Sequence, residues 1–524
     1  DSSTSRGLGD VYKRQLDGST ALNLVNNVTL GSGAVLSLPG SQAITLGGVV
    51  SGAGGLVKNG ASTLTLNGAN NFAGGLTLNG GGLMLGNAGA LGTGLLAVGA
   101  NATLGSTVAL NLGNAIDLDA GAQLSLTSNE NVALGGLITG TGGLIKTGTG
   151  VLSLNNSNTF SGGLTLNAGG LSVGANGALG TGALNIGGSV SLDASAPVSL
   201  VNAVNLGANT LTLPGSSNLT LSGVVSGAGG LIKDGASTLT LSGANTFLGG
   251  ATVNAGTLAL GAGGSLAAIG AVDLAGAGAT LDISAAGTGQ TIGALNGVAG
   301  SHVALGTQTL TFGGASNGSF AGVIDGSGGL IKVGAGVQTL SGANTFSGDV
   351  ALDAGGLILG NSGALGTGTL GIGGNVSLDG TTALNLANAV NFGGGTQLTL
   401  GGSSDLTLAG VVAGSGSLIK NGAGLLTLNN TNTFGGGLTL NGGGLVVGAN
   451  GALGSGTLAV NASTTLDAGA AATLGNAVTL GSGVALTLPG SNALTLSGVI
   501  DGNGSLIKNL SLIHISEPTR RRGI

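Results

Sequence analysis

Short stretches in which apolar and polar residues alternate recur along the whole chain. Between Lys58 and Lys146 they read STLTLNG, GLTLNGG, GLMLG, VALNLG, AIDLD and QLSLT. Alternation with a period of two over four or five residues, bounded by Gly, Asn and Ser, predicts short β-strands joined by tight turns. About eleven such strands are expected in this interval. No segment shows a helical period with caps, so the pattern predicts an all-β protein.

Strands this short cannot each bury a face alone, but stacked coils of them can. The pattern predicts a β-solenoid in which Leu, Val and Ile point inward and stack on their copies in the next coil, while Thr, Ser and Asn point to water. Gly is expected to supply corners with positive φ, and Asn to tolerate the left-handed region and form side-chain ladders.

A fixed period of about 88 residues organises the chain. Successive members of one set of lysines lie 88, 87, 99, 88 and 88 residues apart, and one set each of asparagines and phenylalanines follows the same rhythm. Such a period is typical of a repeat architecture, and three strands per coil predict about four coils of roughly 22 residues in each repeat. The repeated residues, which we expect to have structural roles, are Lys58, Lys146, Lys233, Lys332, Lys420, Lys508, Asn70, Asn158, Asn245, Asn344, Asn432, Phe72, Phe160, Phe247, Phe346 and Phe434.

The two ends depart from this pattern. Repeat sequence begins at Leu16 and stops after Asn509, and all five arginines lie outside that range. The flanks 1–15 and 510–524 contain DVYKRQ and SLIHISEPTRR, which resemble translated sequencing-adapter sequence, so we exclude them from the fold prediction. The expected organisation is a solenoid over 16–509 with a divergent insert at about 262–319, where the 99-residue spacing falls. We expect both natural ends of the protein to be missing.

Composition narrows the function. Between residues 16 and 509, six lysines face fourteen aspartates and Glu130, a net charge of −9, and the chain has no Trp and one Tyr, so we expect no nucleic-acid partner. The absence of Cys excludes a disulfide scaffold, a thiolate zinc site and a cysteine nucleophile. Polar residues interrupt every apolar run well short of the roughly 18 residues of a membrane span, and no signal peptide opens the chain.

Few residues are candidates for chemistry. His302, the one histidine of the repeat region, lies in GSHVALG without a patterned Ser, Asp or second His nearby, which predicts a solvent-facing turn histidine. Asp117 with Asp119, and Asp349 with Asp353, are pairs that could serve glycoside hydrolysis or hold Ca²⁺, but solvated strand-edge pairs are the better interpretation. Four coils apart, successive lysines would stand about 19 Å from one another, which is too far for one basic patch. We therefore expect no catalytic residue, no metal site and no cofactor.

One segment carries a resemblance to a known family. GGLIKDGASTLTLSGANTFLGGATVNAGTLALG, from Gly229 to Gly261, resembles the autotransporter-associated β-strand repeat, with Lys233, Asn245 and Phe247 at the family's Lys, Asn and aromatic positions. Cognate segments recur at Gly54, Gly142, Gly328 and Gly416. The resemblance implies a right-handed parallel β-helix, an autotransporter passenger of a Gram-negative bacterium. It also implies exposure at the cell surface or outside the cell, export through a C-terminal barrel that is missing here, and contact with a membrane only through that barrel.

Two functions of different classes are compatible with these features. The favoured one is a structural stalk or adhesin, with an unknown surface ligand or self-association as its partner, because a long repetitive surface presents many weak contacts at once. The alternative is a β-helical polysaccharide-degrading enzyme, which needs a cluster of Asp with Arg, Lys or His on one face. The divergent range 262–319 offers only Asp273, Asp282 and His302 for such a cluster. A Thr-rich ice-binding solenoid is a third class, but Ser and Asn replace Thr too often for a regular array.

Overall fold

The computed structural model describes residues 13–509, and every regular element in that range is a β-strand, β1 to β63. No helix long and apolar enough to cross a membrane occurs in the described residues. The strands are two to five residues long, all their pairings are parallel, and in most of them buried and half-buried residues alternate. The chain is therefore an all-β parallel solenoid, as the alternating pattern predicts.

The solenoid divides into two compact units. Unit 1 contains the chain up to Gly270 with Ala279–Leu281 and Ala285–Gly287, and unit 2 contains Ala271–Gly278, Asp282–Ser284 and the chain from Thr288. The residues of β34 (Thr280–Asp282) are divided between the units. Strands Lys13–Gln15 and Val35–Leu38 pair in unit 1, so three residues of the excluded flank 1–15 form a strand. The flank 510–524 and residues 1–12 lie outside the described residues.

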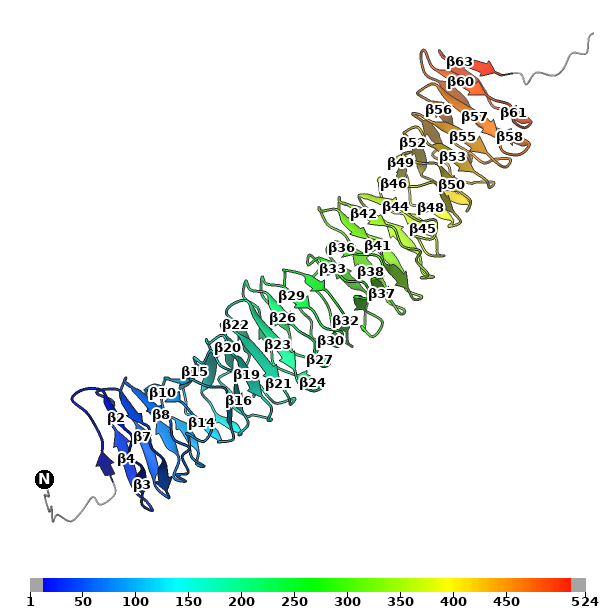
Figure 1. Ribbon diagram of the computed structural model, residues 1–524. Coiled ribbons are helices and arrows are strands. Elements are labelled where there is room, and N and C mark those ends of the chain that lie inside the picture. The colour runs from blue at the N-terminus through cyan, green and yellow to red at the C-terminus, as the bar shows by residue number, and fades with distance from the viewer. Residues whose placement is uncertain (1–12, 510–524) are drawn as a thin grey trace, which may run out of the picture. The chain divides into compact units, whose positions relative to one another are not determined.

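Three faces, here called A, B and C, make up each turn of unit 1 (Figure 1). Face A contains β1 (Lys13–Gln15), β4 (Val35–Leu38), β7 (Gly55–Lys58), β9 (Leu76–Leu78), β11 (Leu96–Val98), β14 (Ile116–Leu118) and β17 (Ile138–Gly140), and later β24 (Val198–Leu200), β27 (Leu219–Leu221), β30 (Thr238–Leu241) and β32 (Thr257–Leu260). Face B contains β2 (Leu22–Leu24), β5 (Ile44–Leu46), β8 (Thr63–Leu66), β10 (Gly81–Leu85), β12 (Ala102–Ser106), β15 (Gln123–Leu126), β18 (Gly143–Lys146), β20 (Leu164–Leu166), β22 (Leu184–Ile186), β25 (Val204–Asn205) and β28 (Val225–Ser226). Face C contains β3 (Val28–Leu30) and β6 (Val50–Gly52), and later β13 (Leu110–Leu112), β16 (Val132–Leu134), β19 (Val151–Leu154), β21 (Gly170–Val173), β23 (Val190–Ala194), β26 (Leu211–Leu213), β29 (Leu231–Lys233) and β31 (Ala251–Val253).

Unit 2 is built in the same way from faces D, E and F. Face D contains β35 (Gln290–Ile292), β38 (Leu310–Phe312), β41 (Leu330–Lys332), β43 (Val350–Leu352), β45 (Leu370–Ile372), β48 (Val390–Phe392) and β51 (Val412–Gly414), and later β58 (Ala472–Leu474) and β61 (Leu494–Leu496). Face E contains β33 (Val272–Leu274), β36 (Leu295–Gly297), β39 (Gly318–Phe320), β42 (Val337–Leu340), β44 (Gly356–Leu359), β46 (Val376–Gly380), β49 (Gln397–Leu400), β52 (Ser417–Lys420), β54 (Leu438–Leu440), β56 (Leu458–Val460), β59 (Val478–Leu480) and β62 (Ile500–Gly502). Face F contains β37 (His302–Ala304) and β40 (Val323–Asp325), and later β47 (Leu384–Leu386), β50 (Leu406–Leu408), β53 (Leu425–Leu428), β55 (Gly444–Val447), β57 (Thr464–Ala468), β60 (Ala485–Leu488) and β63 (Ser505–Lys508).

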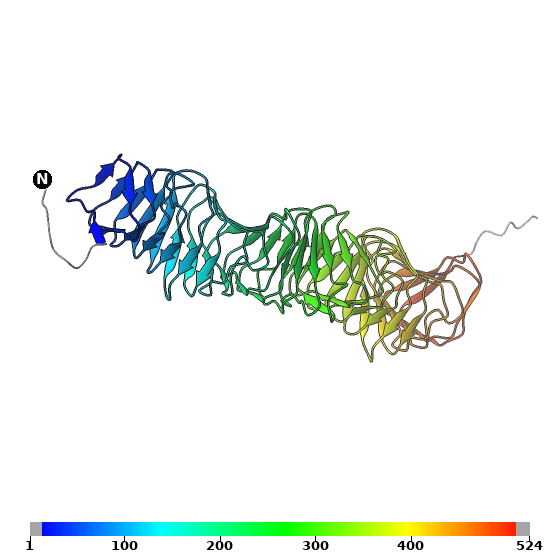
Figure 2. The same ribbon diagram turned by 90° about the horizontal axis from the view of Figure 1, so that it is seen from below.

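Like residues stack on like residues along each face. Leu144 pairs with Leu164, and Leu164 with Leu184, so one column of buried leucines runs through three turns of face B. Within each unit the strands lie side by side as parallel arrows (Figure 2). Because side chains alternate between the two sides of a strand, this register stacks the inward Leu, Val and Ile residues in columns.

The corners follow the prediction for Gly but not for Asn. Many corner glycines have positive φ, for example Gly334 at 72°, whereas no other residue type in the described chain does. The expectation that Asn adopts the left-handed region is therefore wrong. The expected Asn ladder does occur on the surface, where Asn461 donates to Asn441 at 3.1 Å and Asn441 donates to Asn421 at 2.8 Å.

The repeat does not contain a whole number of turns, contrary to the expected four coils of roughly 22 residues. Cross-turn hydrogen bonds join residues 19 to 24 apart. From β7 on face A, four stacking steps lead to β17, and the next Lys lies on the following strand, β18 of face B. The repeat thus equals four turns plus one face. In unit 1 the signature lysine moves from A to B to C, and in unit 2 from D to E to F.

Candidate functional site

Five of the repeated lysines are buried in the core, so they cannot form a basic stripe on the surface. Their side chains are only 1–2% exposed. Lys146 stands in an inward column, paired with Leu126 in the preceding turn and with Leu166 in the next. The signal was present in the sequence, because in each LIK segment the Lys is two residues beyond an inward Leu and alternation turns both to the same side. The buried lysines are Lys58, Lys146, Lys233, Lys332 and Lys420.

Backbone carbonyl groups receive the ammonium group of each buried lysine. Lys332 Nζ donates to the carbonyl oxygens of Val333 at 2.8 Å, Gly334 at 3.0 Å and Ala354 at 3.2 Å. Lys58 makes the same kind of contacts with Asn59, Gly60 and Gly80. Removal from water lowers the pKa of all five side chains below the usual 10.5. In Lys58, Lys233 and Lys332 the ammonium group thus joins the corner after its own strand to the corner one turn further on.

The lowered lysine pKa values predict an alkaline rise in stability. Between the folded-state pKa and 10.5 the unfolded chain binds more protons than the folded chain, so the free energy of unfolding rises with pH in that window. Urea titrations at neutral pH and near pH 10.5 measure the slope. Lys332→Met, which keeps the stem but cannot titrate, should have a smaller slope than the parent; an equal slope would contradict the assignment.

The five repeated asparagines are also buried, where the sequence predicts Asn side chains that point to water. Asn158 Oδ1 accepts the Ile138 N–H at 2.9 Å, and its Nδ2 donates to the Ala178 carbonyl at 2.7 Å. These partners lie 20 residues before and after it, so one amide connects three turns. The other four make the equivalent pair of bonds, with partners at residues 50 and 90, 225 and 265, 324 and 364, and 412 and 452.

The repeated phenylalanines fill the core where a face lacks a strand. Each is at most 1% exposed. Phe160 lies on face A between β17 and β24, and its backbone still accepts a hydrogen bond from Thr181 N at 2.9 Å. The strandless segment moves one face per repeat with the rest of the signature. Aromatic bulk there replaces the inward side chains that a strand would have supplied.

A second set of buried asparagines was not recognised in the sequence. Asn114 Nδ2 donates to the carbonyls of Gly92 at 3.1 Å and Gly94 at 2.7 Å, and Asn202, Asn388 and Asn476 do the same at the equivalent glycines. Asn114 and Asn202 lie 88 residues apart, as do Asn388 and Asn476, so the repeat period itself was the available signal.

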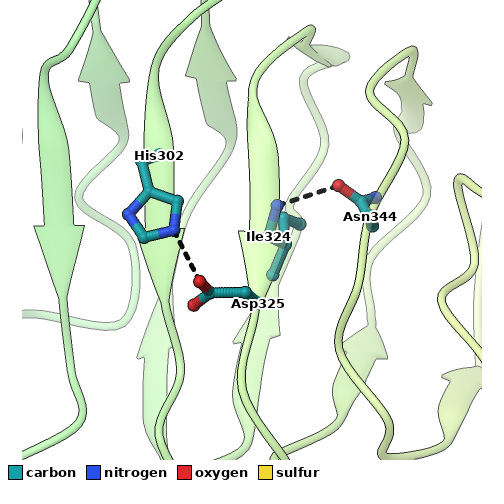
Figure 3. Close-up of polar contacts among 4 residues, drawn as sticks. All are labelled: His302, Ile324, Asp325 and Asn344. Atoms are coloured by element: carbon teal, nitrogen blue, oxygen red, sulfur yellow. Dashed lines mark hydrogen bonds and ion pairs between the residues drawn. The ribbon is translucent and has the colours of Figure 1, made fainter.

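His302 differs from its prediction in two respects. It begins strand β37 instead of lying in a turn, and its Nε2 is 3.0 Å from Oδ2 of Asp325 on β40, the next turn of face F (Figure 3). The prediction that no Asp lies nearby is therefore wrong, because the stacking of β37 on β40 brings Asp325, 23 residues away in sequence, diagonally opposite His302. On the neighbouring Ile324, the N–H donates to Asn344 Oδ1 at 2.9 Å, so this surface pair lies beside a buried signature amide.

The His302–Asp325 pair should contribute little to stability. The two side chains are 34% and 46% exposed, and an exposed ion pair contributes about 0–1 kcal/mol. A double-mutant cycle with His302→Gln and Asp325→Asn, followed by urea unfolding, should give a coupling energy below about 1 kcal/mol. A coupling of several kcal/mol would show that the pair is part of a larger network.

In each candidate acidic pair, the two aspartates occupy different positions relative to their strand. Asp117 is half-buried on β14 and accepts from Thr139 Oγ1 at 2.7 Å, whereas Asp119 follows the strand and is exposed. Asp349 and Asp353 stand just before and just after β43, and Asp349 accepts the Thr369 N–H at 2.8 Å. Among the described residues no group of three or more His, Asp or Glu side chains is arranged to hold a metal ion.

Burial of the lysines leaves a surface with mainly negative charge. All fifteen acidic residues between 16 and 509 are exposed or half-buried, while five of the six lysines in that range are in the core. The geometry therefore defines a class of protein, a repeat solenoid whose signature residues serve the stacking of turns and whose outer faces vary between repeats.

The comparisons with known proteins identify the repeat. The passenger-associated-transport-repeat family matches residues 56–85, 144–173, 231–260, 330–359 and 418–447. Every match contains one Lys, one Asn and one Phe of the signature. The chain therefore contains five copies of this passenger-associated repeat, one in each 88-residue period that carries a match.

A curated relative agrees with this assignment. The chain is 36% identical over 196 residues to the adhesin BmaC autotransporter of Brucella suis biovar 1 (strain 1330), an alignment that covers 37% of this chain and 5% of that protein. No solved structure matches the chain.

Proposed function

We propose that the chain is a surface-displayed stalk and adhesin, exported across the outer membrane of a Gram-negative bacterium. The observation that carries the proposal is the five passenger repeats together with a relative that is named an adhesin. The position of the signature supports it, because repeated lysines, asparagines and phenylalanines that lie in the core hold turns together and leave the outer faces free to differ. Many weak contacts along such faces add up to firm attachment.

Two measurements test this proposal. Antibodies against the 524-residue chain should label intact cells of the source bacterium, and beads coated with the purified chain should attach to host cells or to one another more than albumin-coated beads do. Labelling that requires permeabilised cells would contradict surface display. Beads that behave like the albumin control would contradict an adhesive role.

The catalytic alternative has one specific observation in its favour, the His302–Asp325 pair. A polysaccharide-degrading passenger would use these groups for proton transfer, which requires a substrate within hydrogen-bond reach. Viscosity or reducing-end assays on polysaccharides with the parent chain and His302→Gln separate the two functions. Cleavage by the parent that His302→Gln abolishes would replace the adhesin proposal.

A further inference from the structure

A polar groove crosses the outer surface of face C in unit 1. It spans strands β19, β21 and β23 and has a volume of about 320 Å³. Ligand pockets fall within about 300–1,000 Å³, so the size suits a small ligand or a segment of a chain. Its floor and walls include Val151, Ser153, Gly170, Ser172, Ser191 and Asp193.

Strand register builds this groove from two outward rows. Val151, Gly170 and Ser191 are paired in one row, and Ser153, Ser172 and Asp193 in the other. Gly170 leaves the centre of the first row without a side chain, and a Cβ there would lie 2.9 Å from Ser191 Oγ. The result is a trough with hydroxyl groups on three successive strands and a carboxylate at one end.

Among the five repeats, a polar residue occupies this position only in the second. The positions equivalent to Ser172 are occupied by Met84, Ala259, Ile358 and Val446, none of which is polar and three of which are large. In the fourth repeat Ile358 lies between Thr339 and Asp379, as Ser172 lies between Ser153 and Asp193. The same trough with the same carboxylate is thus filled there by a branched apolar side chain.

The charges and donors of the groove select the ligand chemistry. Asp193 Oδ1 accepts the N–H groups of Ala194 at 2.9 Å and Ser216 at 3.0 Å, and Oδ2 accepts the Ser216 hydroxyl at 2.5 Å. The carboxylate is therefore fixed, and Oδ2 keeps a lone pair for an additional donor. Anionic ligands are disfavoured because the nearby cation, Lys233, is in the core. A single carboxylate is insufficient for a metal, and the hydroxyl lining disfavours apolar ligands.

We propose that this groove binds a neutral saccharide chain, with sugar hydroxyls donating to Asp193 and exchanging hydrogen bonds with Ser153, Ser172 and Ser191. The proposal rests on the adhesin function and names the ligand class that one of its faces takes. Because only one of the five repeats has a serine at this position, we expect one binding site per chain.

Two substitutions that exchange residues between equivalent positions of the second and fourth repeats test the site. Ser172→Ile inserts the residue that the fourth repeat already accommodates, so it should fill the groove while the fold and the unfolding midpoint stay unchanged. The reverse change, Ile358→Ser, should open an equivalent groove beside Asp379. The probes are neutral hexose and N-acetylhexosamine oligomers on an array, with sialylated and uronic-acid oligomers in parallel, followed by titration calorimetry of any oligomer that binds.

The parent should bind neutral oligomers with one site, Ser172→Ile should weaken binding by about tenfold or more, and Ile358→Ser should add a second site. The proposal is overturned if no neutral oligomer binds, if acidic oligomers bind better, or if Ser172→Ile binds as the parent does. Because the assay uses purified chain, these results are independent of bead attachment and cell labelling. Attachment that persists without glycan binding would reject the groove and leave the adhesin function standing.

Discussion

Asn158→Asp should lower the free energy of unfolding by about 3–5 kcal/mol at neutral pH, a loss typical of an uncompensated buried charge. The new carboxylate can still accept the Ile138 N–H, but its second oxygen faces the Ala178 carbonyl, which the amide group of Asn158 approaches at 2.7 Å as a donor. An acceptor would then meet an acceptor in the core. Urea unfolding of the 524-residue chain, with hydrogen exchange at residues 138 and 178, measures the effect.

The same substitution carries a pH signature. Burial should raise the folded-state pKa of the new carboxyl above the usual value of about 3.9, so the folded chain binds more protons than the unfolded chain between these two values. Stability should therefore recover as the pH falls through the raised pKa, because the protonated group can donate to Ala178 again. The control is Asn167→Asp at an exposed position, where little change is expected. Equal losses at the two positions would reject the cross-turn role of Asn158.

Phe247→Ala should cost about 3–5 kcal/mol, the range for removal of a buried aromatic side chain. Phe247 is 1% exposed and fills the core where face B has no strand, so no neighbouring inward side chain of its own segment can close the cavity. The adjacent Leu248 is 49% exposed, which makes Leu248→Ala a matched control with an expected loss of less than about 1 kcal/mol. Urea midpoints compare the two. Similar losses would show that the strandless segment is not an integral part of the core.

Both predictions concern residues whose side chains lie in the core of the solenoid. The polar side chains of the repeat signature form hydrogen bonds inside the solenoid. Each Lys donates to backbone carbonyl groups, and each Asn accepts from one backbone N–H and donates to one backbone carbonyl. The outer positions, such as Ser172 and its counterparts Met84 and Ile358, are then free to change from repeat to repeat without disturbing the stack. This division suits a repeat protein that keeps one architecture and presents different surfaces.

Several features were predictable because they depend on residues close together in sequence. Alternation in segments such as STLTLNG predicts the short strands, and the spacing between lysines predicts the repeat that the family matches confirm. The alternation in LIK also indicates that Lys146 points inward. This signal is easily missed, because lysine side chains generally lie in water.

Other features required the stacking of turns. The partner of His302 is Asp325, and no local pattern marks that pair, because the residues that meet across turns depend on spacings that vary from 19 to 24 residues. For the same reason, the period of 88 residues alone predicts four whole coils in each repeat. In the structure each repeat covers four turns and one further face, so the signature lysine moves by one face from each repeat to the next within a unit. The groove at Ser172 likewise exists only because three strands align Gly170 with the hydroxyl groups of Ser153, Ser172 and Ser191.

The sequence by itself determined the strand type, the repeat and the identity of the inward apolar columns, since these follow from alternation and periodicity along a single strand. Only the tertiary structure decided the face on which each repeat lies, the carbonyl partners of the buried lysines, the three-turn bridges of the asparagines and the position of the groove. The physical reason is that hydrogen bonds and side-chain columns between turns depend on the number of residues in every corner, and a change of one or two residues there alters which groups meet without changing the local pattern.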